Sequence, residues 1–457
     1  MSIHLAPEYE QAYQDAKLYF SYTFDYEQDL SLAVLLRSFP EENTRFFWQT
    51  PDRQHLLVGF GQRTKLFPDD GVTMNNQKKR LHQQTMDPDN RLCLFGAFPF
   101  DVQANAAPLW NQLAEGGFLL PKVLFTFNQG RWQVTLTVKR PATFAALTTR
   151  FQKEQHRIIL ALSQAAPKVQ KNRLVTSQEI AVKKWMETVD QAVKTIRNPN
   201  NTLKKIVLAR QLALEMNEPI DQVALLQRLE TQQPQTYLFY LQEGNSTFIG
   251  ATPEKLLAAT TKKVTTVAVA GSIQRGKTPS EDTRLGQELL HSAKNLQEHQ
   301  IVVERLQKNL QPFSQSTVNV SQRTLLKNRD IQHLYAELIG TRADDGASLF
   351  EMIQQLHPTP ALGGEPKQAA IEWIRTHEPV GRGLYGAPIG WVSLAEDAGE
   401  FAVGIRSAVI SGKHALLYAG CGIVADSNAE EERQETKMKF QPMKRGIQDE
   451  DTTTDDD

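Results

Sequence analysis

One face of a predicted helix near the carboxyl end carries two carboxylates and a lysine. In ERQETKMK, Glu432, Glu435 and Lys439 fall at i, i+3 and i+7, which places them on the same side of a helix. Mg²⁺ takes oxygen ligands and is often held by one or two carboxylates together with an anionic substrate. This segment alone leaves two interpretations open, a metal site and a solvated acidic end of a helix.

A further acidic residue, Glu298, lies in a segment with the apolar periodicity of one long helix, LLHSAKNLQEHQIVVERLQKNL. Glu298 falls off the apolar stripe, one helical turn from Lys294. It is therefore either a surface ion-pair partner of Lys294 or a metal-binding carboxylate that works with Glu435. The predicted core stripe consists of Leu289, Ala293, Leu296, Val303, Leu306 and Leu310.

Two more groups, Lys205 and Glu254, could exchange protons with a substrate. In KKIVLARQLAL, strand alternation puts Lys205 on the same face as Val207, so its amine could point into a cavity, although most lysines are solvated. In FIGATPEKLL we expect a strand, a turn and a helix, with Thr252 as N-cap, Pro253 next and Glu254 just inside. A helix dipole would lower the pKa of that carboxyl, so Glu254 needs burial to act as an acid at neutral pH.

An anion grip is predicted in the stretch GEFAVGIRSAVISGKHALLYAGCGIV. Two strands flank a Ser-Gly-Lys turn, and Arg406 shares a strand face with small residues such as Gly404. An arginine can hold a carboxylate with two parallel hydrogen bonds, and Gly420 and Gly422 would let backbone N–H groups approach an anion. The alternative is a structural ion pair beside tightly packed strands.

The elements that must position these groups fall into two parts followed by an acidic tail. Residues 1–165 are expected to be β-rich, and residues 175–445 to carry the site. We expect PKVQKNR to be a surface linker and QEIAVKKWMETVDQAVKTI a helix, while Ser427 and Glu430 have the capping-box spacing that starts a later helix. Residues 446–457 are dense in like charge and are expected to be disordered. The strands expected in the first part are FFWQT, HLLVGFG, RLCLFGAFPF, KVLFTFNQG and WQVTLTV, before the helix FAALTTRFQKEQHRIILAL.

Composition narrows the classes of function. The 457 residues are 40% hydrophobic and 8% aromatic, enough to bury a substantial core, and the formal net charge is −1. Because such a chain has no overall basic field for a nucleic acid or an anionic membrane surface, we expect a small-molecule substrate. Cys93 and Cys421 support neither a disulfide framework nor a structural zinc site. The amino terminus lacks a signal-peptide pattern and no apolar run could span a bilayer, so we expect a cytoplasmic protein.

Taken in order, these segments resemble the chorismate-utilizing enzymes, the family that includes isochorismate, salicylate, anthranilate and aminodeoxychorismate synthases. The resemblance implies an α+β fold, a single large domain in which mixed β-sheets pack with helices around a central cleft that binds one Mg²⁺ and chorismate. It runs from about residue 180 to 445. It rests on the motifs KIVLAR, FIGATPEKLL, VAGSIQRG, SAKNLQEHQIVV, HLYAELIGTR, LHPTPALGGEP, RGLYGAPIGWV, GEFAVGIRSAV and YAGCGIVADSNAEEERQET, with the lysine after it.

The resemblance implies metal binding for three of the candidate residues and proton transfer for two others. Glu298 and Glu435 would be the metal ligands, with Glu432 behind them or linked through water. Lys205 would deprotonate the attacking water as a general base. Glu254 would protonate the departing ring hydroxyl as a general acid.

The resemblance also implies a grip on the substrate carboxylate, with two departures from the family pattern nearby. His333 would line the same cleft, with a buried structural histidine as the alternative. Gly386 and Ala387 stand in the reverse of the usual order, and Arg433 stands where an aromatic residue is usual. The residues of the implied grip are Arg406, Tyr385, Lys439 and the backbone at Gly420 and Gly422.

Two positions favour the isochorismate branch of the family. Isochorismate and salicylate synthases resemble each other in carrying a lysine at the place of Lys205, where anthranilate synthases usually carry glutamine. Ala361 is typical of isochorismate synthases, whereas anthranilate and salicylate synthases generally carry threonine there. The implied reaction is addition of water at C2 of chorismate with loss of the C4 hydroxyl.

Alternatives to that reaction stay open. Salicylate formation would add elimination of pyruvate to the same isomerisation, and a chorismate-binding protein would show no turnover. We expect no glutaminase subunit, and a monomer or weak dimer. By analogy of length and amino-terminal region, the product is expected to feed menaquinone rather than a siderophore.

Overall fold

The computed structural model describes residues 3–163, 172–343 and 347–448. Its strands form one hydrogen-bonded sheet with two arms, which start at opposite edges of β6 (Gly117–Asn128). All pairings among the described strands are antiparallel except that of β1 with β4. The β3 arm runs through β3 (His55–Leu66), β2 (Thr44–Gln49), β10 (Tyr237–Glu243), β11 (Ser246–Thr252), β20 (Ser407–Ser411), β21 (His414–Ile423) and β9 (Lys205–Met216). The β5 arm runs through β5 (Cys93–Ala97), β18 (Pro388–Ser393), β19 (Gly399–Val403), β12 (Lys255–Ala259), β13 (Lys263–Gln274) and β16 (Ile331–Thr341).

Further strands extend the edges of this framework. On β6 they are β7 (Arg131–Lys139), β1 (Tyr19–Tyr26) and β4 (Thr85–Met86); on β9, β8 (Leu174–Glu179) and β17 (Gly364–Glu365); and on β16, β14 (Asn319–Val320) and β15 (Thr324–Lys327).

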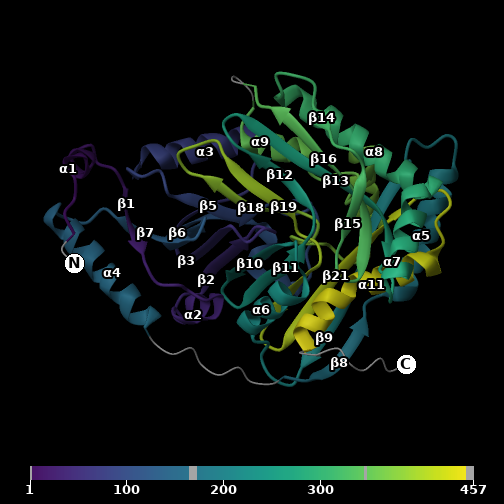
Figure 1. Cartoon of the computed structure of the whole chain (residues 1–457), viewed down its shortest axis with the longest axis horizontal. Helices are drawn as coiled ribbons and strands as arrows, with labels where there is room; N and C mark the ends of the chain where they lie inside the picture. The colour runs from purple at the N-terminus through teal and green to yellow at the C-terminus, as the bar shows by residue number, and fades with distance from the viewer. Residues whose placement is uncertain (1–2, 164–171, 344–346, 449–457) are drawn as a thin grey trace.

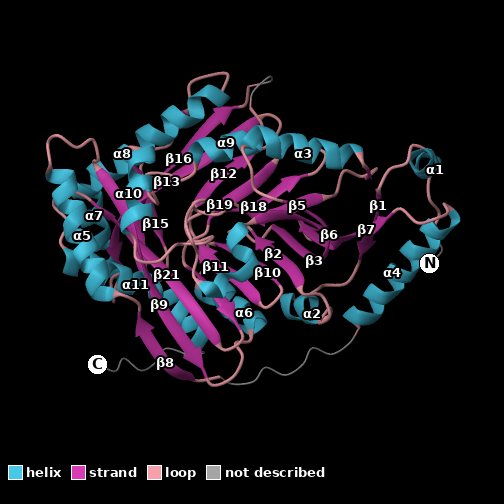
Figure 2. Ribbon diagram, turned by 180° about the vertical axis from the view of Figure 1, so that it is seen from behind, coloured by secondary structure: helices cyan, strands magenta, loops and turns pink. Residues whose placement is uncertain are grey.

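Helices pack on the outer faces of both arms, so that apolar side chains are covered on each side of the sheet. Figures 1 and 2 show α3, α9 and α8 along one edge of the molecule and α2, α6 and α11 along the opposite edge. The helices are α1 (Pro7–Gln14), α2 (Leu32–Arg37), α3 (Gly71–Gln83), α4 (Ala145–Leu162), α5 (Val182–Arg197), α6 (Gln222–Gln232), α7 (Pro279–His291), α8 (Ala293–Leu310), α9 (Leu349–Leu356), α10 (Lys367–His377) and α11 (Ala429–Gln448), with the 3₁₀ turns η1 (Pro108–Glu115) and η2 (Gln311–Phe313).

Three buried clusters form the core. One packs α1, α2, α4, α6 and α11 on the β3 arm, and another packs α3, α8, α9 and α10 on the β5 arm. The third joins Trp48 and Phe239 of the β3 arm to Phe95 and Ile389 of the β5 arm, so it lies between the arms. This architecture confirms the α+β class, and the expected amino-terminal strands and the helix at 145–162 are all present.

The helix expected after Pro253 is absent, and this prediction is wrong. Glu254 instead occupies the turn between β11 and β12, and the segment after it pairs with β13 and β19. Leu256 and Leu257 of β12 are buried in that position. Tertiary pairing therefore overrides a local pattern that is typical of a helix start.

The long helix expected over residues 289–310 is two helices, α7 and α8. Ser292 separates them with extended backbone, and its side chain accepts from the N–H of Asn295 to cap α8. The break rotates the core stripe, so that Ala293 is exposed and Leu296 half-buried. The buried residues of α8 are His299, Val302, Val303, Leu306 and Leu310.

Two helix starts also differ from the prediction. Gln178 and Glu179 belong to β8, and α5 begins at Val182. Asn428 caps α11 by accepting from the N–H groups of the residues two and three positions on, whereas Ser427 Oγ accepts from the N–H of Val424. Most of PKVQKNR and residues 449–457 of the expected tail lie outside the described residues. Residues 446–448 of that tail belong to α11, where Ile447 is buried, so the prediction of disorder is wrong for them. Within the described ranges no helix is both long and apolar enough to cross a membrane.

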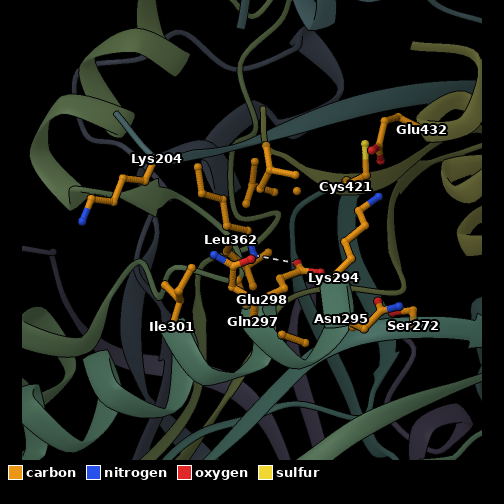
Figure 3. Close-up of a pocket in the computed structure, with 18 of the residues that line it drawn as sticks. Lys204, Ser272, Lys294, Asn295, Gln297, Glu298, Ile301, Leu362, Cys421 and Glu432 are labelled. Carbon is orange, nitrogen blue, oxygen red and sulfur yellow. Dashed lines mark hydrogen bonds and ion pairs between the residues drawn. The ribbon is translucent and has the colours of Figure 1, made fainter. Parts of the chain in front are cut away.

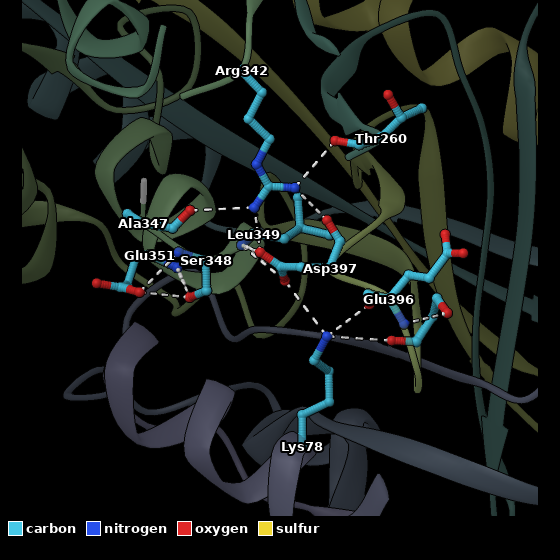
Figure 4. A network of polar contacts seen from close by, with 10 residues as sticks. Lys78, Thr260, Arg342, Ala347, Ser348, Leu349, Glu351, Glu396 and Asp397 are labelled. Atoms are coloured by element: carbon cyan, nitrogen blue, oxygen red, sulfur yellow. Dashed lines mark hydrogen bonds and ion pairs between the residues drawn. The ribbon is translucent and has the colours of Figure 1, made fainter. Parts of the chain in front are cut away.

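A partly buried ionic network ties the amino-terminal part of the chain to the β5 arm (Figure 4). Lys78 of α3 donates to the carbonyl of Glu396 at 2.8 Å and to Asp397 Oδ1 at 3.5 Å. Arg342 ion-pairs with Asp397, whose carboxylate also accepts from the N–H of Leu349 at the start of α9. Lys78 and Arg342 are both buried, so Asp397 is the counter-charge on which both depend.

Replacing Asp397 with alanine is expected to lower the free energy of unfolding by about 3 kcal/mol, because two buried cations would lose their counter-charge. Urea denaturation measures this change. Glu288→Ala is the matched control: it removes an exposed carboxylate from an i,i+4 pair with Arg284 and should cost less than about 0.5 kcal/mol. Equal losses in the two variants would contradict the proposed role of Asp397.

Candidate functional site

A cavity of about 1070 Å³ opens where β9 and β21 lie against α8 and α11. Its walls come from segments far apart in the chain, and each motif contributes part of a strand, a turn or a helix face. The side chains or backbone of every candidate site residue line it: Lys205, Glu254, Glu298, His333, Ala361, Tyr385, Arg406, Gly420, Gly422, Glu435 and Lys439. Glu432 lines it as well. The structure thus brings together residues that the sequence could only name separately.

Lys205 is one of the most buried cations in the protein. As the first residue of β9 it is 1% exposed, and its Nζ donates to Glu298 Oε1 at 2.8 Å. Figure 3 shows Glu298 and Lys294 on α8, with the dashed contact reaching Glu298. Burial raises the pKa of Glu298, but the ion pair with Lys205 outweighs it and holds that pKa below its ordinary value. The partner of Glu298 is therefore Lys205, and the surface pair with Lys294 is not formed.

The carboxylates of α11 face the same cavity. Lys439 Nζ donates to Glu435 Oε1 at 2.5 Å and to the carbonyl of Gly420 at 2.8 Å, which joins α11 to β21. Glu432 is buried beside Cys421 (Figure 3). Burial and the neighbouring Glu435 raise the pKa of Glu432. The predicted common face of α11 is confirmed.

Carboxylate oxygens are the ligands that Mg²⁺ prefers, and the donors around this cavity fit that ion. Glu298 and Glu435 each hold a lysine ammonium, so both oxygens are already set in positions where a cation is favourable. Among residues 3–163, 172–343 and 347–448, no group of three or more His, Cys, Asp or Glu side chains is arranged to hold a metal. The donors therefore fit a site in which two carboxylates and the substrate would share the metal.

Glu254 is buried, which is the condition for this carboxyl to act as an acid at neutral pH. Its place in the turn between β11 and β12 removes the expected helix dipole, and the residue is 5% exposed. Burial raises the pKa of Glu254 to about 8, against the opposing charges of Arg406, Lys205 and Lys439. The carboxyl is therefore mostly protonated at pH 7 and can donate a proton.

Arg406 does not lie on a continuous strand, and that prediction is wrong. It occupies the connection between β19 and β20 with φ +50°, a left-handed conformation that is rare for a residue with a side chain. Its guanidinium approaches His333 Nε2 at 3.5 Å, and His333 Nδ1 contacts Ser272 Oγ at 2.7 Å. Burial and the Arg406 charge hold the pKa of His333 well below its ordinary value, so this histidine is neutral. Unusual backbone of this kind is often found where a side chain is held for function.

The two departures from the family pattern have structural reasons. Gly386 has φ +75°, and its N–H donates to the carbonyl of Gly404, so glycine is needed at this position while the adjacent Ala387 is fully buried. Arg433 NH2 pairs with Glu179 at 3.2 Å, a carboxylate that it shares with buried Arg210. Neither departure removes Tyr385 or Glu435 from the cavity wall.

Gly420 and Gly422 provide space as well as backbone. A Cβ on Gly422 would lie 2.6 Å from Lys205 Cε and 3.2 Å from Glu298 Oε1. A Cβ on Gly420 would lie 3.0 Å from the hydroxyl of Tyr385. Because neither glycine has a side chain, Lys205, Glu298 and Tyr385 have room beside β21.

Sequence analysis missed several residues of the wall. Ser272, Asn295 and Cys421 line the cavity, and Ser272 contacts His333 directly. VAGSIQRG contains Ser272 within a motif of the family resemblance, which was the available signal. Asn295 and Cys421 also lie in motifs of the resemblance, SAKNLQEHQIVV and YAGCGIVADSNAEEERQET, but only the packing of α8 and β21 brings them to the cavity wall.

Comparisons with known proteins agree with this site. Residues 7–448 match the family described as "Chorismate binding enzyme". The chain is 32% identical over 438 residues to "Isochorismate synthase MenF" of Bacillus subtilis, covering 87% of each protein. It is 34% identical over 362 residues to "Salicylate biosynthesis isochorismate synthase" of Pseudomonas aeruginosa, covering 78% of this chain and 74% of that protein. It also resembles the structure of MenF, the menaquinone-specific isochorismate synthase from Escherichia coli, with a TM-score of 0.80 and 25% identity over 96% of this chain and 99% of that one.

Proposed function

Because the chain belongs to the family of chorismate-binding enzymes, we propose that it is an isochorismate synthase that adds water at C2 of chorismate and expels the C4 hydroxyl. The observation that carries this proposal is that Lys205 and Glu254 both line the wall of one cavity. The first is a buried amine, and the second is a buried carboxyl whose pKa is raised to about 8. The acid form of Glu254 is thereby available at neutral pH, and Lys205 can act as the base after its ammonium group has released a proton.

The residues divide the work between proton transfer and substrate binding. Lys205, in its amine form, accepts a proton from the attacking water, and Glu254 donates one to the departing hydroxyl. Arg406 and Lys439 supply positive charge for a substrate carboxylate, and Arg406 can bind one with two hydrogen bonds. Tyr385 and the backbone at Gly420 and Gly422 complete this grip.

Glu298 and Glu435 would hold Mg²⁺, which when bound supplies charge to neutralise the ring carboxylate of chorismate. Both side chains contact lysine ammonium groups, which would have to move away from these oxygens for a metal to bind. Glu432 would stand behind Glu435. The carboxylates of the substrate and of these side chains would then offset the positive charge of the metal.

Two residues of the same cavity support the isochorismate branch of the family. A lysine at position 205 favours water over ammonia as nucleophile, and the small Ala361 in the wall favours release of isochorismate over further elimination. The resemblance to the menaquinone-specific enzyme supports menaquinone as the destination of the product. We expect a cytoplasmic enzyme, a monomer or weak dimer, that works without a glutaminase subunit.

The proposal is tested by incubating the purified protein with chorismate in the absence of ammonia and identifying the products by chromatography and mass spectrometry. Isochorismate without pyruvate is expected. Salicylate together with pyruvate would assign the chain to the salicylate synthases, and binding without turnover would make it a chorismate-binding protein.

Metal removal gives a separate expected result. A chelator should abolish turnover and added Mg²⁺ should restore it. Glu435→Gln should raise the Mg²⁺ concentration for half-maximal activity by roughly tenfold or more, because even the partners of metal ligands are worth 10- to 100-fold. Glu430→Gln, on the solvent-facing side of the same helix, is the control. Turnover that survives chelation, or the same shift in both variants, would contradict the metal site.

A further inference from the structure

Three buried aromatic residues connect the amino-terminal part of the chain to the cavity. Trp110 Nε1 donates to the hydroxyl of Tyr418 at 2.7 Å. The ring of Tyr418 in turn stacks on Tyr385, with 5.1 Å between centroids and 17° between planes. All three side chains are at most 3% exposed, and only Tyr385 lines the cavity.

Trp110 is itself firmly held. It lies in η1, where the side chain of Asn111 donates to Ser246 Oγ at 2.8 Å and that hydroxyl donates to the carbonyl of Leu109 at 2.9 Å. These contacts attach η1 to the first residue of β11. The indole also fills the space beside Gly383, where φ is +57° and a Cβ would lie 2.4 Å from the ring. Trp110 therefore contacts the loop that carries Tyr385 as well as the ring that stacks on it.

The hydroxyl of Tyr385 depends on this packing for its position. Among the residues that the structure describes, none is hydrogen-bonded to that hydroxyl, which lies over Gly420. Tyr418 and Gly420 are two residues apart on β21 and share one face of the strand. A shift of Tyr418 would consequently displace the stacked ring of Tyr385 across Gly420.

We propose that Trp110 is a positioning residue for substrate binding: through its hydrogen bond to Tyr418 it holds the ring of Tyr385 against the substrate-carboxylate grip. This inference rests on the proposed function, since it takes Tyr385 as a contact of the substrate carboxylate. Among the described residues, the amino-terminal part supplies none to the cavity wall, so the inference gives it an indirect share in substrate recognition.

Trp110→Phe removes the hydrogen-bond donor and keeps an aromatic ring. We expect the KM for chorismate and its dissociation constant to rise about three- to tenfold, the range for loss of one neutral hydrogen bond, with kcat changed less than twofold. Tyr418→Phe removes the acceptor and should have the same effect. The double variant should equal either single variant, because both remove one contact.

Trp48→Phe is the matched control. Trp48 is fully buried in the same cluster between the arms, but its Nε1 has no hydrogen-bond partner among the described residues. It should leave KM within twofold of the parent value. Thermal unfolding of both tryptophan variants reports any general loss of packing.

The decisive comparison repeats Trp110→Phe in a Tyr385→Phe background, with steady-state kinetics and with chorismate binding measured by calorimetry. The inference predicts no additional loss of affinity there. It is overturned if Trp110→Phe weakens binding equally with and without the Tyr385 hydroxyl, or if Trp48→Phe has the same effect. If the wild-type protein binds chorismate without turnover, the proposed function is refuted, and calorimetry still tests the role of Trp110. If the wild-type protein does not bind chorismate, both the proposed function and the inference are overturned.

Discussion

Replacing Lys205 with alanine is expected to lower kcat by about 10²- to 10⁴-fold, the range for loss of a general base. Chorismate binding should be largely retained, because the substrate carboxylate is assigned to Arg406, Lys439 and Tyr385. Lys205 is 1% exposed in the cavity wall, so bulk solvent has little access to take the place of its amine as the base. Single-turnover kinetics and calorimetric titration with chorismate separate the loss of chemistry from the loss of binding.

The control for this variant is Lys263→Ala. Lys263 is also the first residue of a long strand, β13, but it is exposed and lies outside the cavity wall. Its removal should leave kcat and KM unchanged within twofold. A Lys205→Ala protein that loses chorismate affinity and thermal stability as strongly as it loses turnover would make Lys205 a structural partner of Glu298 instead of a base.

Replacing Glu254 with glutamine is expected to lower kcat by about 10²- to 10³-fold, because an amide keeps the shape and neutrality of the protonated carboxyl but cannot protonate the leaving hydroxyl. Burial raises the pKa of Glu254 to about 8. The acid form is therefore present at pH 7 and is lost as the pH rises through 8. The wild-type rate should fall above about pH 8, and the variant should lack this limb.

Stability measurements distinguish this chemical role from a structural one. Because the folded-state pKa of Glu254 lies above the ordinary 4.5, the folded protein binds this proton more tightly than the unfolded chain. The contribution of Glu254 to stability therefore declines as the pH rises from about 4.5 to 8. Glu254→Gln removes that decline, so its melting temperature should gain on the wild type across this window while turnover is lost.

Glu400→Gln serves as a matched comparison for Glu254. Burial also raises the pKa of Glu400, which accepts from the hydroxyl of Tyr237 at 2.7 Å away from the cavity. Turnover should be unaffected in this variant. An alkaline limb that persists in Glu254→Gln, or that disappears in Glu400→Gln, would assign the titration to another group.

The sequence was sufficient for features that depend on local pattern. Alternation in 205–212 put Lys205 on a strand, and helical spacing put Glu432, Glu435 and Lys439 on one face. Features set by long-range contacts were not predictable in this way. β12 replaces the expected helix because β19 and β13 pair with it, and Arg406 leaves the strand because β19 and β20 join different neighbours.

The protonation and the positioning of site residues likewise depend on long-range contacts. The protonated state of Glu254 follows from its burial in a cavity wall built from segments distant in the chain, and no spacing near Glu254 indicates it. The link from Trp110 to Tyr385 crosses more than 270 residues through a hydrogen bond and a ring stack. Motif order identified the family because each local segment carries its own residue types, whereas the geometry that makes those types reactive comes from packing.

The most direct test of the central claim is to run the reaction with chorismate and Mg²⁺ in H₂¹⁸O and to measure the mass of the product at early times. Attack of water at C2 with loss of the C4 hydroxyl predicts isochorismate that carries one ¹⁸O atom at C2. Isochorismate without ¹⁸O would show that the original hydroxyl migrates and would contradict the roles given to Lys205 and Glu254.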